Sequence, residues 1–337
     1  MGSRLLALLV ALACLGHGPA EAQSFFKGKT VRIIVGAAAG GGFDTYARAV
    51  ARHLGKHLAG NPTVIVENVT GAGGLISANQ LYKVAKPDGL TVGHFLGSLL
   101  LGQALGQQGI EFDARKFEYL GAAVKEDVTC AFTRASGITS IEKWAASKTP
   151  VKMGGVALGV PPDNTARILK AALGLPIQLV SGYKGTAPIR LAAEGGEVAG
   201  ACWSWESMRA TWRKALEAGE AVVVLQVTPR ALPDLPRVPL AIDLAKTDEG
   251  RRLIQAIQGT SAYARPFVLP PGTPKDRVQM MRKAFQDTLE DRALLAEAEK
   301  AKLTLDPVGG EELQKMIGEL FGMDPTLLAK LKETLYN

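Results

Sequence analysis

The chain has 337 residues, of which 47% are apolar, so it is long enough to form two domains that each bury a core. Its net charge is +7, but lysine and arginine do not occur in blocks and only 6% of the residues are aromatic. This composition excludes the clustered basic surface of a nucleic-acid-binding protein and favours the attraction of small anionic solutes.

The first 22 residues are typical of a cleavable signal peptide. Arg4 precedes an apolar run at 5–15, and Ala-Glu-Ala at 20–22 forms a small-x-small cleavage site. The apolar run is too short to span a membrane. Cys14 offers lipid attachment as an alternative, but Ala11 stands where such sites usually carry leucine. We therefore expect export, with a mature chain that begins near Gln23.

The predicted elements of the first part alternate strand and helix. They are a strand at 31–35, a helix through 47–58, a strand at 63–68, a helix at 76–85 and a strand at 90–96. This order predicts a parallel sheet with right-handed crossover connections.

The same alternation continues to residue 228. Strands are expected at 128–134, 151–156, 177–183, 198–205 and 222–228, and helices at 140–147, 161–174, 185–196 and 206–219. Cys130 and Cys202 lie in two of these strands. In an oxidising compartment they could form a disulfide, and two buried small residues fit the sequence equally well.

The last part of the chain is proline-rich at 229–239, adds one strand within 263–274, and is then mostly helical. We expect an α/β protein of two lobes, each a mostly parallel sheet flanked by helices, with a ligand cleft between them. Residues 23–120 and 229–337 would form lobe 1 and residues 121–228 lobe 2, with crossings near 119–127 and 226–230.

Four glycine-rich turns, at 36–44, 68–74, 154–162 and 181–186, each follow a strand and precede a helix. Ligands bind at the carboxyl ends of strands in such sheets, and helix N-termini direct N–H groups at anions. Each turn could therefore hold a carboxylate, sulfate or phosphate.

Two classes of enzyme fail on their motifs. A dinucleotide-binding site needs G-x-G-x-x-G followed by an acidic residue; Glu67 could be that residue, but GAAAGGG does not have the glycine spacing. No phosphate-loop motif occurs either. G-x-S-x-G is also absent. His53 and His57 share a helix face, but Leu54 stands where a zinc protease carries glutamate, so we expect two solvated histidines. For His94 a hydrogen-bonded core position is favoured over ligand contact.

Three side chains in or beside the turns allow two interpretations. Asp44 could bind a ligand, but a capping role at the start of the helix is favoured because a buried carboxylate would repel an anion. Trp203, like Trp205 beside it, could wall a pocket, but simple packing at a strand end is favoured. Tyr183 lies inside a glycine turn, from which its hydroxyl could reach the ligand.

A set of short motifs in this order resembles the exported receptors of tripartite tricarboxylate transporters, the Bug or TctC family. The motifs are GGGFD at 40–44, Asn68 with GAGG at 71–74, PDG at 87–89, YKG at 183–185, GGEV at 195–198, LPDLP at 232–236 and PPGTP at 270–274. The resemblance covers essentially the whole mature chain.

The resemblance implies a type II periplasmic-binding-protein fold without catalysis, metal or cofactor. Two lobes close over a small organic carboxylate, which a monomeric periplasmic receptor delivers to membrane permease subunits. A sensor that docks to a signalling protein is the alternative, and an exported enzyme a more distant one. The implied ligand-binding residues are Ala38, Ala39, Gly40, Gly41, Gly42, Phe43, Asp44, Gly71, Ala72, Gly73, Gly74, Ser98, Gly155, Leu158, Gly159, Val160, Tyr183, Gly185, Thr186, Trp203 and Ser204.

The sequence departs from the family pattern around the expected cleft. Gly36-Ala37 replaces the common Pro-Phe, and Phe43 replaces a polar residue before Asp44. An apolar run at 198–203 stands where an acidic residue is common. These changes would make the cleft larger and more apolar, which predicts a monocarboxylate or aromatic acid rather than a citrate-like triacid.

Overall fold

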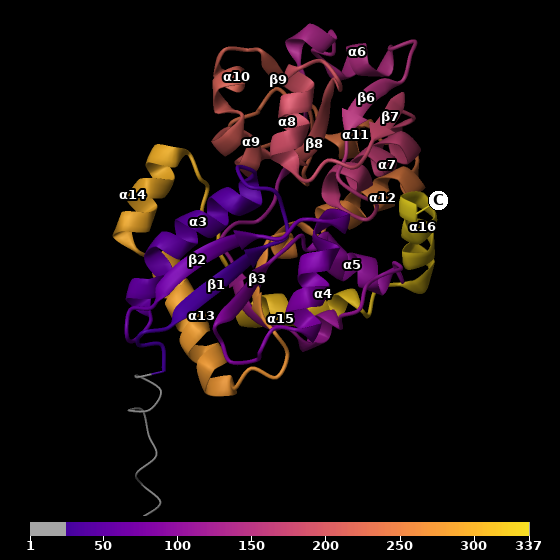
Figure 1. The fold of residues 1–337 in the computed structure, drawn as a ribbon. Helices are drawn as coiled ribbons and strands as arrows, with labels where there is room; N and C mark the ends of the chain where they lie inside the picture. The colour runs from indigo at the N-terminus through magenta and orange to yellow at the C-terminus, as the bar shows by residue number, and fades with distance from the viewer. Residues whose placement is uncertain (1–24, 337) are drawn as a thin grey trace, which may run out of the picture.

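The computed structural model describes residues 25–336, so the predicted signal peptide and Cys14 lie outside the described residues. Two β-sheets form the centres of two lobes (Figure 1). The sheet of lobe 1 has the order β11-β4-β10-β3-β1-β2, and that of lobe 2 has the order β7-β6-β8-β5-β9.

The sheet of lobe 1 is built around β1, whose apolar sequence buries side chains on both faces. Ile33 and Ile34 point to opposite faces and are at most 3% exposed, as expected for a strand covered on both sides. The strands are β1 (Thr30–Val35), β2 (Thr63–Asn68), β3 (Thr91–His94), β4 (Glu118–Ala122), β10 (Pro266–Leu269) and β11 (Val308–Gly309).

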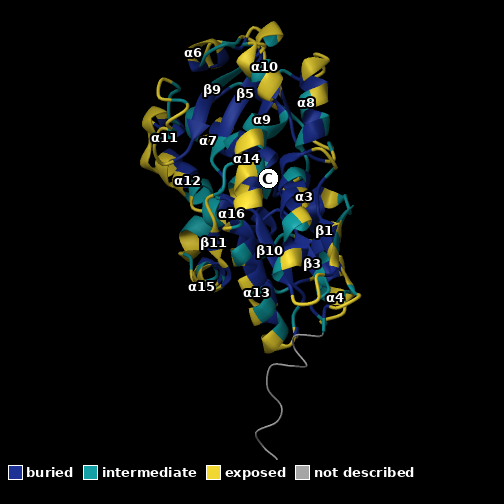
Figure 2. Ribbon diagram, turned by 90° about the vertical axis from the view of Figure 1, so that its left-hand side faces the viewer, coloured by how far each residue is buried: buried dark blue, intermediate teal, exposed yellow. Residues whose placement is uncertain are grey.

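Helices from both ends of the chain cover this sheet. They are α3 (Gly42–Leu54), α4 (Leu75–Lys83), α5 (Ser98–Ala104), α13 (Lys275–Leu289), α14 (Arg292–Ala301) and α15 (Gly310–Leu320). Short 3₁₀ turns are η1 (Gly55–His57), η2 (Ala72–Gly74), η3 (Ala114–Lys116) and η5 (Ser261–Tyr263). Figure 2 shows buried strands beside exposed outer turns of α13 and α14.

Lobe 2 repeats the arrangement on a smaller scale. Its strands are β5 (Val128–Thr133), β6 (Val151–Gly154), β7 (Ile177–Val180), β8 (Gly200–Ser204) and β9 (Ala221–Val227). Its helices are η4 (Arg134–Ser136), α6 (Ile141–Ala145), α7 (Pro161–Leu173), α8 (Thr186–Glu194), α9 (Trp205–Thr211) and α10 (Arg213–Glu217). As the sequence predicts, α7 begins at a proline and ends at Gly174, which has φ of 68°.

The α/β fold class with two flanked sheets is confirmed, but the sheets are mixed rather than mostly parallel. β1 pairs in parallel with β2 and β3, whereas β10 runs antiparallel to β3 and β4. In lobe 2, β5 runs antiparallel to β8 and β9. Parallel pairing follows from helical crossovers within one sheet. β5 and β10 each arrive from the other lobe, so that constraint does not apply to them.

Cys130 and Cys202 are joined by a disulfide in lobe 2. They lie directly opposite each other on the antiparallel strands β5 and β8, and both are fully buried. Of the two possibilities that the sequence left open, the structure has the bridge.

Several helical segments differ from expectation. The helix predicted at 206–219 is two helices, because Trp212 leaves the helical conformation and stacks on Trp203 at 5.3 Å between ring centroids. The sequence patterns also missed α5, α11 (Ala241–Leu244) and α12 (Asp248–Gln258), whereas α16 (Pro325–Tyr336) lies in the part expected to be mostly helical.

The expected lobe bounds stay a prediction, and the packing suggests a change in one of them. α11 packs on β9 and α12 packs on α7, both in lobe 2, and the C-terminal α16 also reaches α7 (Figure 1). We therefore propose that the second crossing lies at 259–265 rather than 226–230. The Glu126 N–H donates to the Ser261 carbonyl at 3.1 Å, which joins this segment to the first crossing at 123–127.

Candidate functional site

A cavity of about 270 Å³ lies between the lobes at the carboxyl ends of β1 and β2. Lobe 1 lines it with Gly36, Ala37, Ala38, Gly41, Gly42, Phe43, Gly71, Ala72, Gly73, Gly74 and Leu96. Lobe 2 lines it with Val156, Pro161, Pro162, Gly182, Tyr183, Lys184, Gly185, Thr186, Trp203 and Ser207. Glu126 and Arg265 from the two crossings complete the wall.

The second glycine turn of lobe 1 depends on backbone conformations that glycine adopts easily. Gly73 has φ of 64° and Gly74 has φ of 88°. A Cβ on Gly73 would lie 2.6 Å from a methyl group of Val160 in lobe 2. The turn is therefore both strained for other residues and pressed against the opposite lobe.

The first turn is folded back on Asp44. The Gly40 N–H donates to Oδ2 of Asp44 at 2.9 Å, and Nε of Arg48 donates to Oδ1 at 2.9 Å. Burial raises the pKa of Asp44, but these hydrogen bonds outweigh it and hold the pKa below its usual value. The side chain is 4% exposed and is not part of the cavity wall. Asp44 thus lies in the first turn of α3 and holds the glycine turn, but the N-cap is Gly41 and not Asp44, so the expected capping role is wrong.

The lobes contact each other directly across the cavity. The Ala38 N–H donates to the Lys184 carbonyl at 3.0 Å. At the start of α3, a Cβ built on Gly42 would lie 1.7 Å from Oγ of Ser207 on α9. Glycine at position 42 therefore allows the two lobes to approach this closely.

The cavity brings together twelve of the predicted ligand-binding residues. They are Ala38, Gly41, Gly42, Phe43, Gly71, Ala72, Gly73, Gly74, Tyr183, Gly185, Thr186 and Trp203. Nine others do not line it: Ala39, Gly40, Asp44, Ser98, Gly155, Leu158, Gly159, Val160 and Ser204.

Most of the predicted turn at 155–160 does not line the cavity, and Asp163 binds two of its amides. Oδ2 of Asp163, which is 1% exposed, accepts from the N–H groups of Val156 and Ala157 at 2.6 and 3.2 Å. Those amides are therefore not free to bind an anion. Ser98 begins α5 and lines a second cavity of about 30 Å³ instead.

The aromatic residues of lobe 2 differ from each other in their roles. Tyr183 lines the cavity and its hydroxyl donates to Oε1 of Glu197 at 2.6 Å, so its contact with a ligand stays a prediction. Trp203 meets both of its interpretations, since it lines the cavity and stacks on Trp212.

The sequence patterns missed a buried polar cluster at the cavity wall. Arg265 is 2% exposed, and its Nη2 donates to Oε1 of Glu126 at 3.0 Å and to the hydroxyls of Ser204 and Ser207. The guanidinium carbon lies 4.7 Å from the centre of the Phe43 ring. A single arginine inside the apolar run YARPFVL was the available signal.

Two carboxyl groups beside this cluster are shifted toward the protonated form. Burial raises the pKa of Glu206 to about 8, and the neighbouring Asp127 carboxylate adds to the effect. Burial also raises the pKa of Asp127. Near neutral pH Glu206 is therefore largely neutral.

Among the histidines of residues 25–336, His94 lies in the core of lobe 1, apart from His53 and His57. His94 is fully buried, stacks on Phe267 with ring centroids 4.0 Å apart, and has Nδ1 at 3.0 Å from the Pro266 carbonyl oxygen. Burial lowers its pKa to about 3. The expected core role is confirmed. His17 lies outside the described residues.

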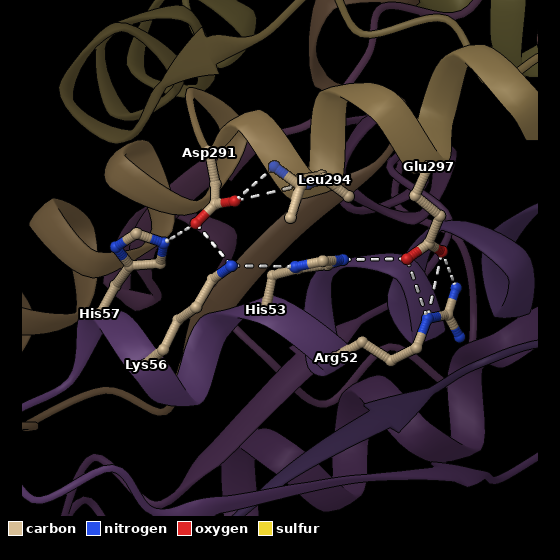
Figure 3. Close-up of polar contacts among 8 residues, drawn as sticks. Arg52, His53, Lys56, His57, Asp291, Leu294 and Glu297 are labelled. Atoms are coloured by element: carbon tan, nitrogen blue, oxygen red, sulfur yellow. Dashed lines mark hydrogen bonds and ion pairs between the residues drawn. The ribbon is translucent and has the colours of Figure 1, made fainter.

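The expectation of solvated histidines on α3 and η1 is wrong. Nε2 of His53 lies 2.9 Å from Oε2 of Glu297, and Nε2 of His57 lies 2.7 Å from Oδ2 of Asp291 (Figure 3). Arg52 and Lys56 pair with the same carboxylates. The cluster joins α14 to α3. Within residues 25–336, no group of three His, Cys, Asp or Glu side chains could hold a metal ion.

Comparison with known proteins gives one matching family and several similar proteins. The family described as "Tripartite tricarboxylate transporter family receptor" matches residues 46–321. A UPF0065 protein from the TAR-I ttuE-ttuC' intergenic region of Agrobacterium vitis is 32% identical over 245 residues, which cover 71% of this chain and 68% of the relative. Another UPF0065 protein, from Bordetella bronchiseptica, is 33% identical over 145 residues, covering 43% of this chain and 42% of the relative.

Solved structures share the fold at low sequence identity. The periplasmic binding protein BugD is 22% identical with a TM-score of 0.73, covering 92% of this chain and 98% of its own. MatC from Rhodopseudomonas palustris with bound malate is 19% identical with a TM-score of 0.72, covering 92% and 100%. An R. palustris protein with adipate is 20% identical with a TM-score of 0.73, covering 91% and 98%.

Proposed function

Because the chain belongs to the tripartite tricarboxylate transporter receptor family, a family of solute-binding receptors, we propose that it binds a small organic carboxylate in the periplasm and delivers it to a membrane transporter. The cavity between the lobes is the observation that carries this proposal. It is enclosed by turns of both lobes, as expected for a receptor that closes over its ligand.

The proposed carboxylate site lies at the N-terminus of α3 and the turn at 71–74. Glycines there let the backbone approach a ligand closely, and the first N–H groups of a helix favour negative charge. Two structural relatives hold malate and adipate, both carboxylates, which supports an acid as the ligand class.

The rest of the wall favours an apolar ligand body. Phe43, Leu96, Val156 and Trp203 all line the cavity, and its volume suits a small molecule. We therefore propose a monocarboxylate or aromatic acid. Calorimetric titration tests this claim: benzoate should bind and citrate should not. Tight binding of citrate without any binding of benzoate would overturn it.

The proposed location and partner follow from the sequence and the family. A signal-peptide pattern at 1–22 supports export, and the family name supports a tripartite permease as the partner. No helix within the described residues is long and apolar enough to cross a bilayer. Co-purification of the protein with the subunits of a tripartite permease would test the partnership.

A thermal-shift assay of the mature protein tests the proposed function as a whole. The panel holds benzoate, pyruvate, malate, adipate and citrate. A ligand that binds only the native state stabilises it, by about 2.7 kcal/mol at a free ligand concentration of 100 times Kd. The midpoint of unfolding therefore rises. We expect at least one acid to raise the midpoint and to be recovered unchanged after long incubation. No shift with any acid would contradict the proposal, and turnover would indicate an enzyme.

A further inference from the structure

Arg265 brings a buried positive charge to the cavity wall from a segment between the lobes. It precedes β10, and its side chain reaches α3 of lobe 1, α9 of lobe 2 and the first crossing. Nε and Nη2 donate to Glu126, at 3.3 and 3.0 Å, and Nη2 also donates to Ser204 and Ser207. These contacts fix the plane of the guanidinium.

The remaining nitrogen, Nη1, is different. It is buried and has no hydrogen-bond partner among the residues that the structure describes. A buried donor without a partner is costly, which makes such an atom a candidate for ligand contact. Nη1 lies 3.2 Å from the position that a Cβ on Gly42 would take, so it is beside the first residue of α3.

The N-terminus of α3 supplies further donors at the same place. The helix has 13 residues, and its N-cap Gly41 carries no side chain that could accept a hydrogen bond from its first N–H groups. The Asp44 carboxylate accepts its hydrogen bonds from the Gly40 N–H and from Arg48. Gly41, Gly42, Phe43 and Arg265 all line the one cavity.

On these observations, and resting on the proposed function, we propose that Nη1 of Arg265 binds the carboxylate of the ligand together with the N-terminus of α3. The anchor for the acid is then a charged side chain and not backbone amides alone. A guanidinium presents fixed donors that match a carboxylate, and a charge-assisted hydrogen bond is about twice as strong as a neutral one.

Glu126 determines how strongly the Arg265 guanidinium attracts a bound acid. Its carboxylate is 8% exposed and pairs with Arg265, so it offsets part of the attraction between the guanidinium and a bound acid. Neutral Gln at position 126 should therefore strengthen anion binding, whereas loss of Arg265 should weaken it. If the ion pair were purely structural, the two substitutions would not change the affinity for an anion in opposite directions.

The experiment is calorimetry on the mature wild type and four variants with the five acids of the thermal-shift panel. For the acids that bind the wild type, we expect Arg265→Met to weaken affinity by about 30-fold or more. Glu126→Gln should strengthen it by about threefold to tenfold. Arg209→Met is the matched control, because Arg209 pairs with Asp234 in lobe 2 and does not line the cavity. It should bind as the wild type does.

A double variant separates anchoring from folding. Arg265→Met alone leaves Glu126 buried without its partner, which could unfold the protein. Arg265→Met/Glu126→Gln removes both charges, so it should fold, as judged by circular dichroism, and still bind weakly. Wild-type affinity in the folded double variant would overturn the proposal, as would unchanged affinity in Arg265→Met or weaker affinity in Glu126→Gln. If no acid of the panel binds the wild type, the proposed function fails and this inference fails with it.

Discussion

At the residue scale, His94 shows how burial in lobe 1 controls a titratable group. Its ring lies between Phe43 and Phe267 and is fully buried. Burial favours the neutral ring, so the pKa falls from 6.5 to about 3. Between these two values the unfolded chain binds a proton that the folded protein does not, and stability therefore falls as the pH falls below 6.5.

This difference predicts a measurable pH dependence. Acidification from pH 7 to pH 5 should cost about 2 kcal/mol of unfolding free energy through His94. The His94→Phe variant has no group to protonate at this position, so its loss of unfolding free energy over the same interval should be smaller than that of the wild type by this amount. Urea unfolding of both proteins at the two pH values measures the effect. Parallel pH dependences in the two proteins would show that His94 does not contribute it.

Arg265 and Glu126 mark the limit of what residue patterns can predict. The glycine turns are local features, since each needs only a strand, a few small residues and a helix in succession, and both turns of lobe 1 reach the cavity. Arg265 and Glu126 are 139 residues apart in the sequence. No local sequence pattern indicates that the two crossings meet at the cavity wall, so this half of the site could not be predicted from the sequence.

At the scale of elements, helix and strand positions in residues 30–94 followed from periodicity. The direction of β5 and β10 did not, because strands that enter from the other lobe are free of the crossover rule. The break between α9 and α10 was also hidden, because Trp212 leaves the helix to stack on Trp203, a contact between separate elements.

The disulfide between β5 and β8 gives a prediction at this scale. It closes a loop with a sequence separation of 72 residues in the unfolded chain. Cys130→Ala/Cys202→Ala should therefore lower the unfolding free energy by about 2 to 4 kcal/mol. Urea unfolding with and without reductant measures the loss. Reductant should destabilise the wild type and leave the double variant unaffected, and equal stability of the two oxidised proteins would contradict the prediction.

At the scale of the whole molecule, contact between the lobes depends on small residues at their interface. Gly42, Gly73 and Gly185 each lie against the opposite lobe. Nζ of Lys330 on α16 pairs with Glu249 on α12 at 3.0 Å, and the Tyr336 hydroxyl on α16 donates to Oε1 of Gln107 in lobe 1 at 3.1 Å, so the C-terminal helix also joins the lobes. Closure over a ligand thus depends on contacts that no single lobe contains.

Gly42→Ala tests this dependence. Alanine suits the first turn of a helix, so lobe 1 should tolerate it, but its Cβ would overlap Ser207 in lobe 2. We expect the variant to fold, to be more open in solution scattering, and to bind acids at least about tenfold more weakly. Gly318→Ala is the matched control, since open space surrounds Gly318 on α15. Wild-type affinity and radius of gyration in Gly42→Ala would show that the contact does not limit closure.

The central claim is that a small acid binds between the lobes. A crystal structure of the protein with the panel acid that raises its unfolding midpoint most tests it directly. The account predicts electron density for the acid within the cavity, with its carboxylate at the N-terminus of α3 beside Arg265 and the turn at 71–74. Density for the acid on an outer surface, with the cavity unchanged, would contradict the account.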